Sequence, residues 1–307
     1  MKKRLIFVVM AMVVSLAGVA DAATDTVEPL VNAEWVNDNP GKPGVVFLDI
    51  RDEASYLNGH LPGAVHTDYD EPYWRVVKNG VPGMLPDAAH LASLIGGLGI
   101  GNEDHVVLAP GGLSAGEMAV ATRIYWTFKT AGHDRVSILD GGMAVYQKKR
   151  QRPLEKGATK PAAKTFKVVF RPEFVATIDD VKRAGNGGNL VDSRSPGQFS
   201  GIIQSPSVKR PGTIPEAGNL PIASLTENNG GVFLSADAAA ALHRKAGIAT
   251  AGPVITFCNT GHVASLGWFV LYELLGNKEA KLYDGSMAEW TMDDANPVKT
   301  EFMPGAK

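Results

Sequence analysis

Cys258, the only cysteine in the 307-residue chain, is the residue whose type and position best suit nucleophilic chemistry. It follows an apolar and β-branched run, Val254 to Phe257, which predicts a short buried strand. A polar turn comes next, and residues 265–275 predict a mostly apolar helix. A thiol between a strand and a helix N-terminus lies where backbone N–H groups and the helix dipole favour an anion, which lowers its pKa from about 8.5. The alternative that position alone leaves open is an inert core thiol.

The N-terminus has the pattern of a secretory signal peptide. Basic residues at 2–4 precede an apolar run at 5–19, and residues 20–22 form a small-x-small cleavage site. We therefore expect residues 1–22 to be removed, leaving a periplasmic mature chain that begins at Ala23 and has no membrane anchor. An uncleaved anchor helix is the alternative. An exported chain with one cysteine has no internal disulfide. A free thiol is a liability in an oxidising compartment, so export favours a functional role for Cys258 over an inert one.

The composition argues against several classes of function. The net charge is −2, and the basic residues are scattered rather than gathered in an aromatic-interleaved stripe, so nucleic-acid binding is not expected. The seven histidines and the single cysteine show no zinc-type spacing. We therefore expect no metal site, and the sequence indicates no cofactor.

The second half of the chain repeats the first in four matched segments that follow the same order. The pairs are Leu48–Arg51 with Val191–Arg194, 59–65 with 211–221, Val106–Pro110 with Val254–Cys258, and 138–146 with 282–290. Alternating strand and helix patterns predict an α/β fold in each copy, with a mostly parallel central sheet and helices on both faces. Ligands bind outside the carboxyl ends of the strands in such sheets, and Cys258 is placed at such an end.

The repeat also sets the expected domain boundaries. Residues 23–150 form the first domain, the basic, proline-containing stretch 151–165 a solvated linker, and residues 166–307 the second domain. The first copy has Pro110 where the second has Cys258, and the loop that follows is longer. Thiol chemistry is therefore confined to the second domain, and we expect the first to be only a scaffold.

Together these motifs resemble the two-domain rhodanese family of thiosulfate and 3-mercaptopyruvate sulfurtransferases. The resemblance covers essentially the whole mature chain, from the Asp-x-Arg strand ends to the Asp-Gly-Ser-x-x-x-Trp motif at 284–290. It implies an inactive first domain and a persulfide on Cys258. It also implies a loop that wraps the sulfane sulfur and consists of Asn259, Thr260, Gly261, His262, Val263 and Ala264.

The reaction that the resemblance implies suits such a loop. A thiolate attacks the outer sulfur of thiosulfate or a related anion, sulfite leaves, and backbone N–H groups stabilise the Cys–S–S⁻ anion. A thiophilic acceptor (cyanide, a thiol or a small thioredoxin-like protein) then removes the sulfur, which predicts ping-pong kinetics. By the same resemblance, Asp192 and Arg194 support the loop. The alternative is a strand-end ion pair with no connection to the chemistry.

The chain departs from the family pattern where the donor anion is expected to bind. Gln198 stands where many members have Arg, and Thr213 stands where the turn often has His. The loop has neither the cations of thiosulfate-type relatives nor the Gly-Ser-Gly-Val-Thr of the mercaptopyruvate type. His262 is a candidate cation, proton donor or rim residue, and Lys209 and Arg210 are candidates for the missing charge. The identity of the donor therefore stays open.

Two other functions compete with sulfur transfer. Cys-loop phosphatases have an Arg six residues after the Cys, whereas this chain has Ala264 there, so phosphoryl transfer is not expected. A sulfur or selenium carrier would form the same persulfide and deliver it to a protein partner without turnover on small acceptors. An inactive scaffold is disfavoured because the chain retains Cys258.

Overall fold

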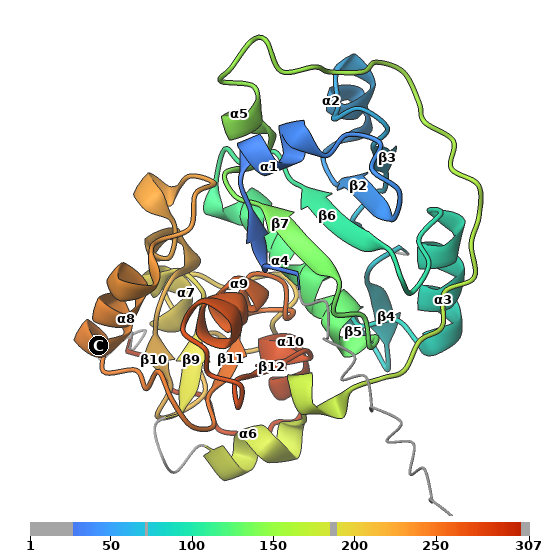
Figure 1. Cartoon of the computed structure of the whole chain (residues 1–307). Helices are drawn as coiled ribbons and strands as arrows, with labels where there is room; N and C mark the ends of the chain where they lie inside the picture. Colours follow the sequence, from blue (N-terminus) through green and yellow to red (C-terminus); the bar gives the residue numbers. More distant parts are fainter. Residues whose placement is uncertain (1–26, 71–72, 185–188, 302–307) are drawn as a thin grey trace, which may run out of the picture.

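The computed structural model describes residues 27–70, 73–184 and 189–301 (Figure 1). The expected signal peptide, residues 1–22, lies outside these ranges. Across the described ranges, no helix has the length and apolar character needed to cross a membrane.

The chain forms two five-stranded parallel sheets that share one strand order. The first sheet runs β1 (Leu30–Val31), β7 (Val136–Leu139), β6 (His105–Ala109), β2 (Val45–Asp49) and β3 (Val65–His66). The second runs β8 (Val175–Ala176), β12 (Lys281–Tyr283), β11 (Ile255–Phe257), β9 (Leu190–Asp192) and β10 (Gly218–Asn219). This confirms the predicted fold of two tandem α/β domains.

The strand register carries the repeat to single residues. Asp49 pairs with Ala109 in the first sheet, and Asp192 pairs with Phe257 in the second. Pro110 comes directly after Ala109, and Cys258 comes directly after Phe257. The two residues therefore occupy equivalent positions at the carboxyl ends of β6 and β11.

Helices and short turns connect the strands. The first half contains α1 (Ala33–Asp38), α2 (Glu53–Asn58), α3 (Ala88–Gly97), α4 (Ala115–Thr130), α5 (Gly142–Tyr146) and a hairpin of β4 (Val76–Lys78) and β5 (Val81–Met84). The second half contains α6 (Ile178–Ala184), α7 (Pro196–Phe199), α8 (Ala236–Lys245), α9 (Ala264–Phe269), its π-helical continuation Val270–Leu274, and α10 (Ser286–Trp290). Three 3₁₀ turns lie at Pro172–Phe174, Ile222–Ser224 and Glu227–Asn229.

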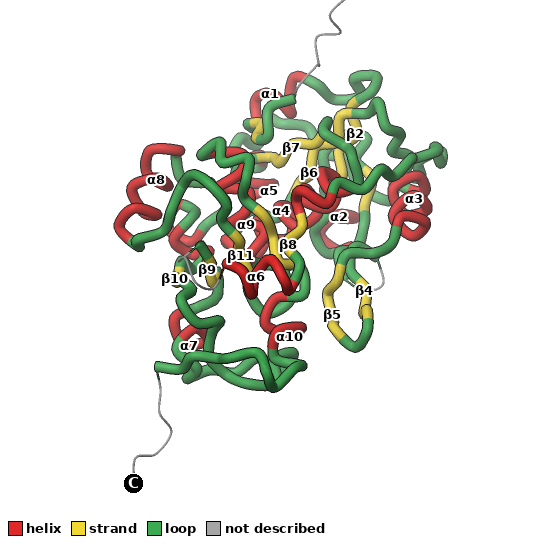
Figure 2. The backbone as a smooth tube through the Cα atoms, turned by 90° about the horizontal axis from the view of Figure 1, so that it is seen from below, coloured by secondary structure: helices red, strands yellow, loops and turns green. Residues whose placement is uncertain are grey.

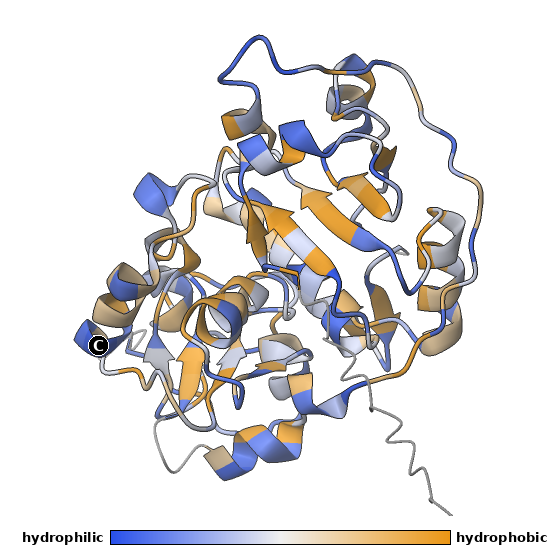
Figure 3. Ribbon diagram, in the orientation of Figure 1, coloured by the Kyte–Doolittle hydropathy of each residue, from blue (hydrophilic) through white to orange (hydrophobic). Residues whose placement is uncertain are grey.

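Both faces of the first sheet are covered, as the runs of apolar residues predict. Neighbouring residues of one strand point to opposite faces, so Leu48 packs in one core cluster and Phe47 in another. Figure 3 shows most strands of both sheets as apolar segments inside more polar surroundings; the edge strand β10 is an exception.

The two domains share a core along α4 and α9. Most residues of α4 are buried on all sides of the helix, which is the pattern of a helix enclosed by protein. The hydroxyls of Thr122 and Ser265 hydrogen-bond across the interface at 2.9 Å. The ring of Tyr125 meets Phe269 edge to face, with 4.9 Å between ring centroids. The interface between the domains is therefore packed like a domain interior.

The stretch 151–165 is mostly exposed, as a solvated linker is expected to be, and it is also bonded to the first domain. It has neither helix nor strand and passes around the outside of the first domain (Figure 1). Glu155 exchanges two backbone hydrogen bonds of 2.9 Å with His60, and Lys164 lies 2.6 Å from the Asp104 carboxylate. A basic composition did not reveal these partners because they lie far away in the sequence.

A fully buried arginine on α4 joins the two domains. The Arg123 guanidinium donates to Asp284 at 2.5 Å, to the Gly261 carbonyl at 3.0 Å and to the Gly83 carbonyl at 3.2 Å. It also lies over the Trp126 ring, 4.6 Å from the centroid. One side chain of the first domain thus holds both a strand end and the cysteine loop of the second.

Replacing this arginine should destabilise the protein strongly. We expect Arg123→Met to lower the free energy of unfolding by about 3–5 kcal/mol, because it leaves the Asp284 carboxylate buried without its cation. The control is Arg171→Met, which removes a more exposed ion pair with Asp134 and should cost less than about 1 kcal/mol. Urea unfolding followed by tryptophan fluorescence measures both, and equal losses would contradict the assignment.

Candidate active site

Cys258 lies at the carboxyl end of β11, in the central part of the second sheet. Its thiol is free and the residue is 1% exposed. The polar turn 259–263 follows, and α9 begins at Ala264. The strand, the turn and the helix therefore follow one another as the sequence predicts.

The turn contains backbone donors without acceptors. Within the described part of the chain, the N–H groups of Asn259, Thr260, His262 and Val263 form no hydrogen bond. These four residues are half-buried. Buried N–H groups are nearly always paired, so unpaired ones beside a thiol indicate a place for an anion.

The sequence interpretation missed Ser286, which binds the backbone of the turn. Its hydroxyl oxygen accepts hydrogen bonds from the N–H of Cys258 at 3.0 Å and of Gly261 at 2.9 Å. The same hydroxyl donates to the Tyr283 carbonyl at 2.8 Å. Ser286 therefore fixes the backbone on both sides of Asn259 and Thr260, two of the residues whose N–H groups stay unpaired.

The first domain shows what this serine replaces. The backbone N–H of Met287 donates to the Cys258 carbonyl at 3.1 Å, and the backbone N–H of Met143 donates to the Pro110 carbonyl at 2.8 Å. Ser286 and Gly142, which precede these two methionines, are therefore equivalent. Both have positive φ, +49° for the serine and +58° for the glycine. A residue with a side chain pays roughly 1–2 kcal/mol for that conformation. The exchange of glycine for serine between the repeats was the signal in the sequence.

The Asp192–Arg194 pair is bonded to the cysteine loop. Arg194 binds the Asp192 carboxylate at 2.5 Å and the Gly212 carbonyl at 2.7 Å, and Arg51 makes the matching bonds in the first domain. Arg194 also donates to the Asn259 side-chain oxygen at 3.2 Å. That bond to the loop is the connection that a supporting role requires.

His262 is held by a tyrosine from the first domain. Its Nδ1 lies 2.5 Å from the Tyr69 hydroxyl, and the two rings are 5.1 Å apart. Burial, with the charges of Arg75 and Arg123, lowers the pKa of His262 to about 3. Burial also raises the pKa of Tyr69 far above its usual 10, so the phenol keeps its proton. At neutral pH His262 is uncharged, which removes the cation from the three roles considered for it.

The other side chains considered for binding the donor anion, all in the second domain, do not reach the loop. Lys209 is exposed, and Arg210 donates to the Asp293 carbonyl at 2.8 Å. Gln198 lies half-buried on α7, and its side chain has no hydrogen bond to a described residue. None of the three is hydrogen-bonded to residues 258–264.

The first domain is more than the scaffold that the sequence predicts. The β4–β5 hairpin lies beside α10 (Figures 1 and 2). A Cβ added at Gly83 of this hairpin would lie 3.1 Å from the Thr260 side chain. The Leu85 N–H donates to the Asp284 carboxylate at 2.8 Å. The sequence could not reveal these contacts because they join residues about 180–200 positions apart without a local pattern.

The first domain keeps a hollow at the position equivalent to Cys258. A cavity of about 410 Å³ is lined there by Arg51, Pro110 and Glu117 among others. The Glu117 carboxylate accepts a hydrogen bond from the Leu113 N–H at 2.8 Å. In the copy without cysteine, a carboxylate of the chain itself therefore occupies the loop.

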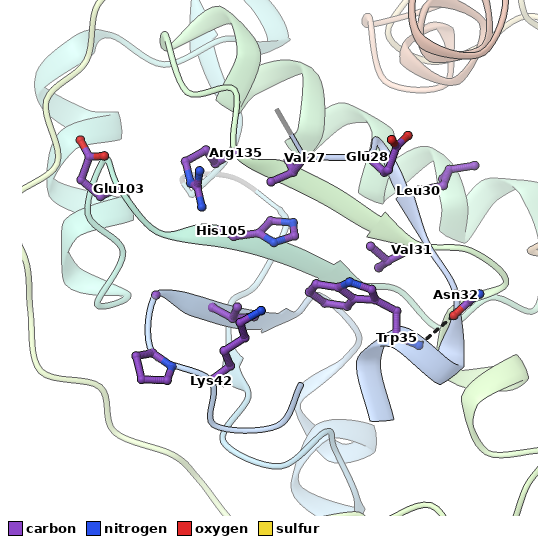
Figure 4. Close-up of a pocket in the computed structure, with 13 residues that line it drawn as sticks. Val27, Glu28, Leu30, Val31, Asn32, Trp35, Lys42, Glu103, His105 and Arg135 are labelled. Atoms are coloured by element: carbon purple, nitrogen blue, oxygen red, sulfur yellow. Dashed lines mark hydrogen bonds between the residues drawn. The ribbon is translucent and has the colours of Figure 1, made fainter. Parts of the chain in front are cut away.

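Another cavity lies away from this chemistry, at the amino ends of the first sheet. It measures about 620 Å³, and Figure 4 shows Trp35, His105 and Arg135 among its lining residues. The Trp35 and His105 rings meet edge to face at 5.3 Å. The Cys258 loop lies instead at the carboxyl edge of the other sheet.

Comparison with known proteins places the chain in a family. The family model of the rhodanese-like domain matches residues 32–149 and 177–293. The chain belongs to the rhodanese family. The two matches confirm the tandem domains that the internal repeat predicts and the family that the motifs resemble.

Similar proteins of this family are named as sulfurtransferases. A putative thiosulfate sulfurtransferase of Mycobacterium tuberculosis is 35% identical over 277 residues, covering 85% of this chain and 94% of the relative. The human 3-mercaptopyruvate sulfurtransferase is 31% identical over 287 residues, covering 86% and 92%. The crystal structure of the Escherichia coli 3-mercaptopyruvate sulfotransferase SseA matches with a TM-score of 0.73 at 28% identity, covering 85% and 99%. These relatives support sulfurtransferase activity for this rhodanese-family protein.

Two substitutions at Ser286 separate its hydrogen bonds from its backbone strain. Ser286→Ala keeps a Cβ at positive φ and loses the acceptor for two N–H groups, so we expect a loss of about 1–3 kcal/mol in unfolding free energy. Ser286→Gly loses the same acceptor but relieves the backbone, so it should be about 1 kcal/mol more stable than Ser286→Ala. Chemical denaturation measures the unfolding free energy of both variants. If Ser286→Gly were less stable than Ser286→Ala, the claim that residue 286 is strained by its positive φ would be wrong.

The low pKa of His262 predicts a contribution to acid sensitivity. The unfolded chain binds the proton near pH 6.5 and the folded chain near pH 3, so stability falls as the pH drops from about 6.5 towards 3. His262→Gln removes this titration, so the variant should lose less stability than the parent between pH 7.5 and 4.5. Melting temperatures at both pH values provide the measurement. Equal losses in the two proteins would show that His262 does not titrate in this way.

Proposed function

We propose that the protein transfers a sulfane sulfur from thiosulfate, or a related anionic donor, to a thiophilic acceptor through a persulfide on Cys258. The observation that carries this proposal is the group of unpaired N–H donors in the turn beside a free thiol. A persulfide anion requires several such donors and no proton-transfer machinery. Membership in a family with sulfurtransferase relatives supports the same conclusion.

In the first half-reaction, the Cys258 thiolate attacks the outer sulfur of the donor. A new S–S bond forms, the bond between the two donor sulfurs breaks, and its electron pair leaves on sulfite. The enzyme then holds Cys–S–S⁻ within residues 258–264, with Ser286 fixing the backbone and Arg194 holding Asn259. In the second half-reaction, cyanide, a thiol or a thioredoxin-like protein attacks the terminal sulfur and restores the thiolate.

Thiosulfate is the donor that we favour over 3-mercaptopyruvate. Arg123 is paired with the buried Asp284, whereas the carboxylate partner of Arg75 is exposed to solvent, so the charge of Arg75 makes the surroundings of the loop more positive. A dianion gains more from such surroundings than a monoanion does. We also propose that the mature protein works in the periplasm, on the basis of the signal-peptide pattern in residues 1–22.

Turnover with small molecules tests this function. The purified mature protein should release thiocyanate from thiosulfate and cyanide, and Cys258→Ser should reduce the rate to the uncatalysed background. Lys209→Gln is the control, because Lys209 is exposed and is not hydrogen-bonded to residues 258–264. A Cys258→Ser variant that keeps its activity would refute the nucleophile.

Intact-mass spectrometry separates the donors and the carrier alternative. After treatment with thiosulfate, the protein should gain one sulfur atom, and Cys258→Ser should gain none. A gain with 3-mercaptopyruvate alone would overturn the donor assignment. A gain from thiosulfate that is never passed to cyanide or a thiol would indicate a sulfur or selenium carrier that delivers to a protein partner.

A further inference from the structure

An anionic donor needs a cation with free donors near the cysteine loop. Arg194 of the second domain reaches Asn259, but it is buried and already paired with Asp192. The three polar side chains considered there are Gln198, Lys209 and Arg210. The first is uncharged, the second is exposed, and the third is bonded to Asp293. The cations that act on the loop come instead from the first domain.

Of these cations, Arg123 is already occupied and Arg75 is not. Arg123 is fully buried, and its two terminal nitrogens are bonded to Asp284, Gly261 and Gly83. Among the described residues, Arg75 forms one ion pair, a long one of 3.4 Å with Asp70. A guanidinium has five N–H donors, so most of those on Arg75 remain available.

The position of Arg75 is fixed although most of its N–H donors have no partner among the described residues. Its guanidinium lies over the Tyr69 ring, 4.7 Å from the centroid, and its side chain is 18% exposed. Its partner Asp70 is 86% exposed, so solvent weakens the pair. Its Nε is buried and has no hydrogen-bond partner among the described residues. A mostly buried guanidinium with spare donors is costly unless an anion completes it.

Arg75 lies beside the cysteine loop. Its Nη1 is 3.3 Å from the point where a Cβ at Gly83 would be, and the Thr260 carbonyl oxygen is 3.2 Å from that same point. Tyr69, on which Arg75 stacks, is hydrogen-bonded to His262 of the same loop.

We propose that Arg75, supplied by the domain without a cysteine, binds the oxyanion end of the sulfur donor and selects anionic donors. This inference rests on the proposed function and names the residue that determines its donor class. The Arg75 guanidinium donates to the sulfonate oxygens of thiosulfate while Cys258 attacks the outer sulfur. As the S–S bond breaks, the guanidinium stabilises the charge that gathers on the departing sulfite.

A binding experiment without turnover tests this subsite. In a Cys258→Ser background, which cannot form a persulfide, isothermal titration calorimetry with thiosulfate gives the dissociation constant. Arg75→Gln should weaken binding by about 10- to 100-fold, the range for charge-assisted hydrogen bonds. Arg75→Lys keeps the charge but not the planar guanidinium, so its dissociation constant should lie between those of the Arg75 protein and Arg75→Gln. Lys209→Gln is the matched control and should change nothing.

Kinetics of the cysteine-containing enzyme give a second readout. In a ping-pong reaction, Arg75→Gln should lower kcat/KM for thiosulfate by a similar factor and leave kcat/KM for cyanide unchanged. Equal losses for both substrates would indicate a structural role and overturn the proposal.

The binding outcomes separate this inference from the proposed function. Undetectable thiosulfate binding in the Cys258→Ser protein, unchanged binding in Arg75→Gln, or a loss in Lys209→Gln instead would each overturn the subsite. Arg75-dependent binding in a protein that never releases thiocyanate would support the anion subsite and refute the proposed function.

Discussion

The structure depends on one buried ion pair between its two halves. Arg123 of α4 binds Asp284 and the Gly261 carbonyl, so the first domain holds the cysteine loop in place. An arginine without its carboxylate could not be buried here at reasonable cost, and the reverse is equally true. The shared core along α4 and α9 keeps water away from the pair. The geometry of the loop is thus a property of the domain interface as much as of the second domain.

The duplication shows how one scaffold came to serve two purposes. Equivalent backbone hydrogen bonds close both copies after the central strand, on Pro110 in one and on Cys258 in the other. The first loop accepts its own Glu117 carboxylate, whereas the second leaves its donors unpaired. The same fold with empty donors and a thiol is suited to hold a charged sulfur.

The sequence was sufficient to predict features that arise from local pattern and from repetition. The apolar runs, the matched segments and the strand-end Asp-x-Arg motif predicted both sheets and the position of Cys258. It was not sufficient for the contacts between domains. Nothing around Tyr69 indicates that its hydroxyl meets His262, because the two residues are 193 positions apart. The neutral state of His262 follows from burial, which a sequence does not show.

The central claim is that the loop after β11 stabilises a sulfur anion on Cys258. A crystal structure of the protein after exposure to thiosulfate tests it most directly. We predict a second sulfur bonded to Cys258 Sγ, within hydrogen-bonding distance of the N–H groups of Asn259, Thr260, His262 and Val263. An unmodified Sγ, or a terminal sulfur turned away from those N–H groups, would contradict the account.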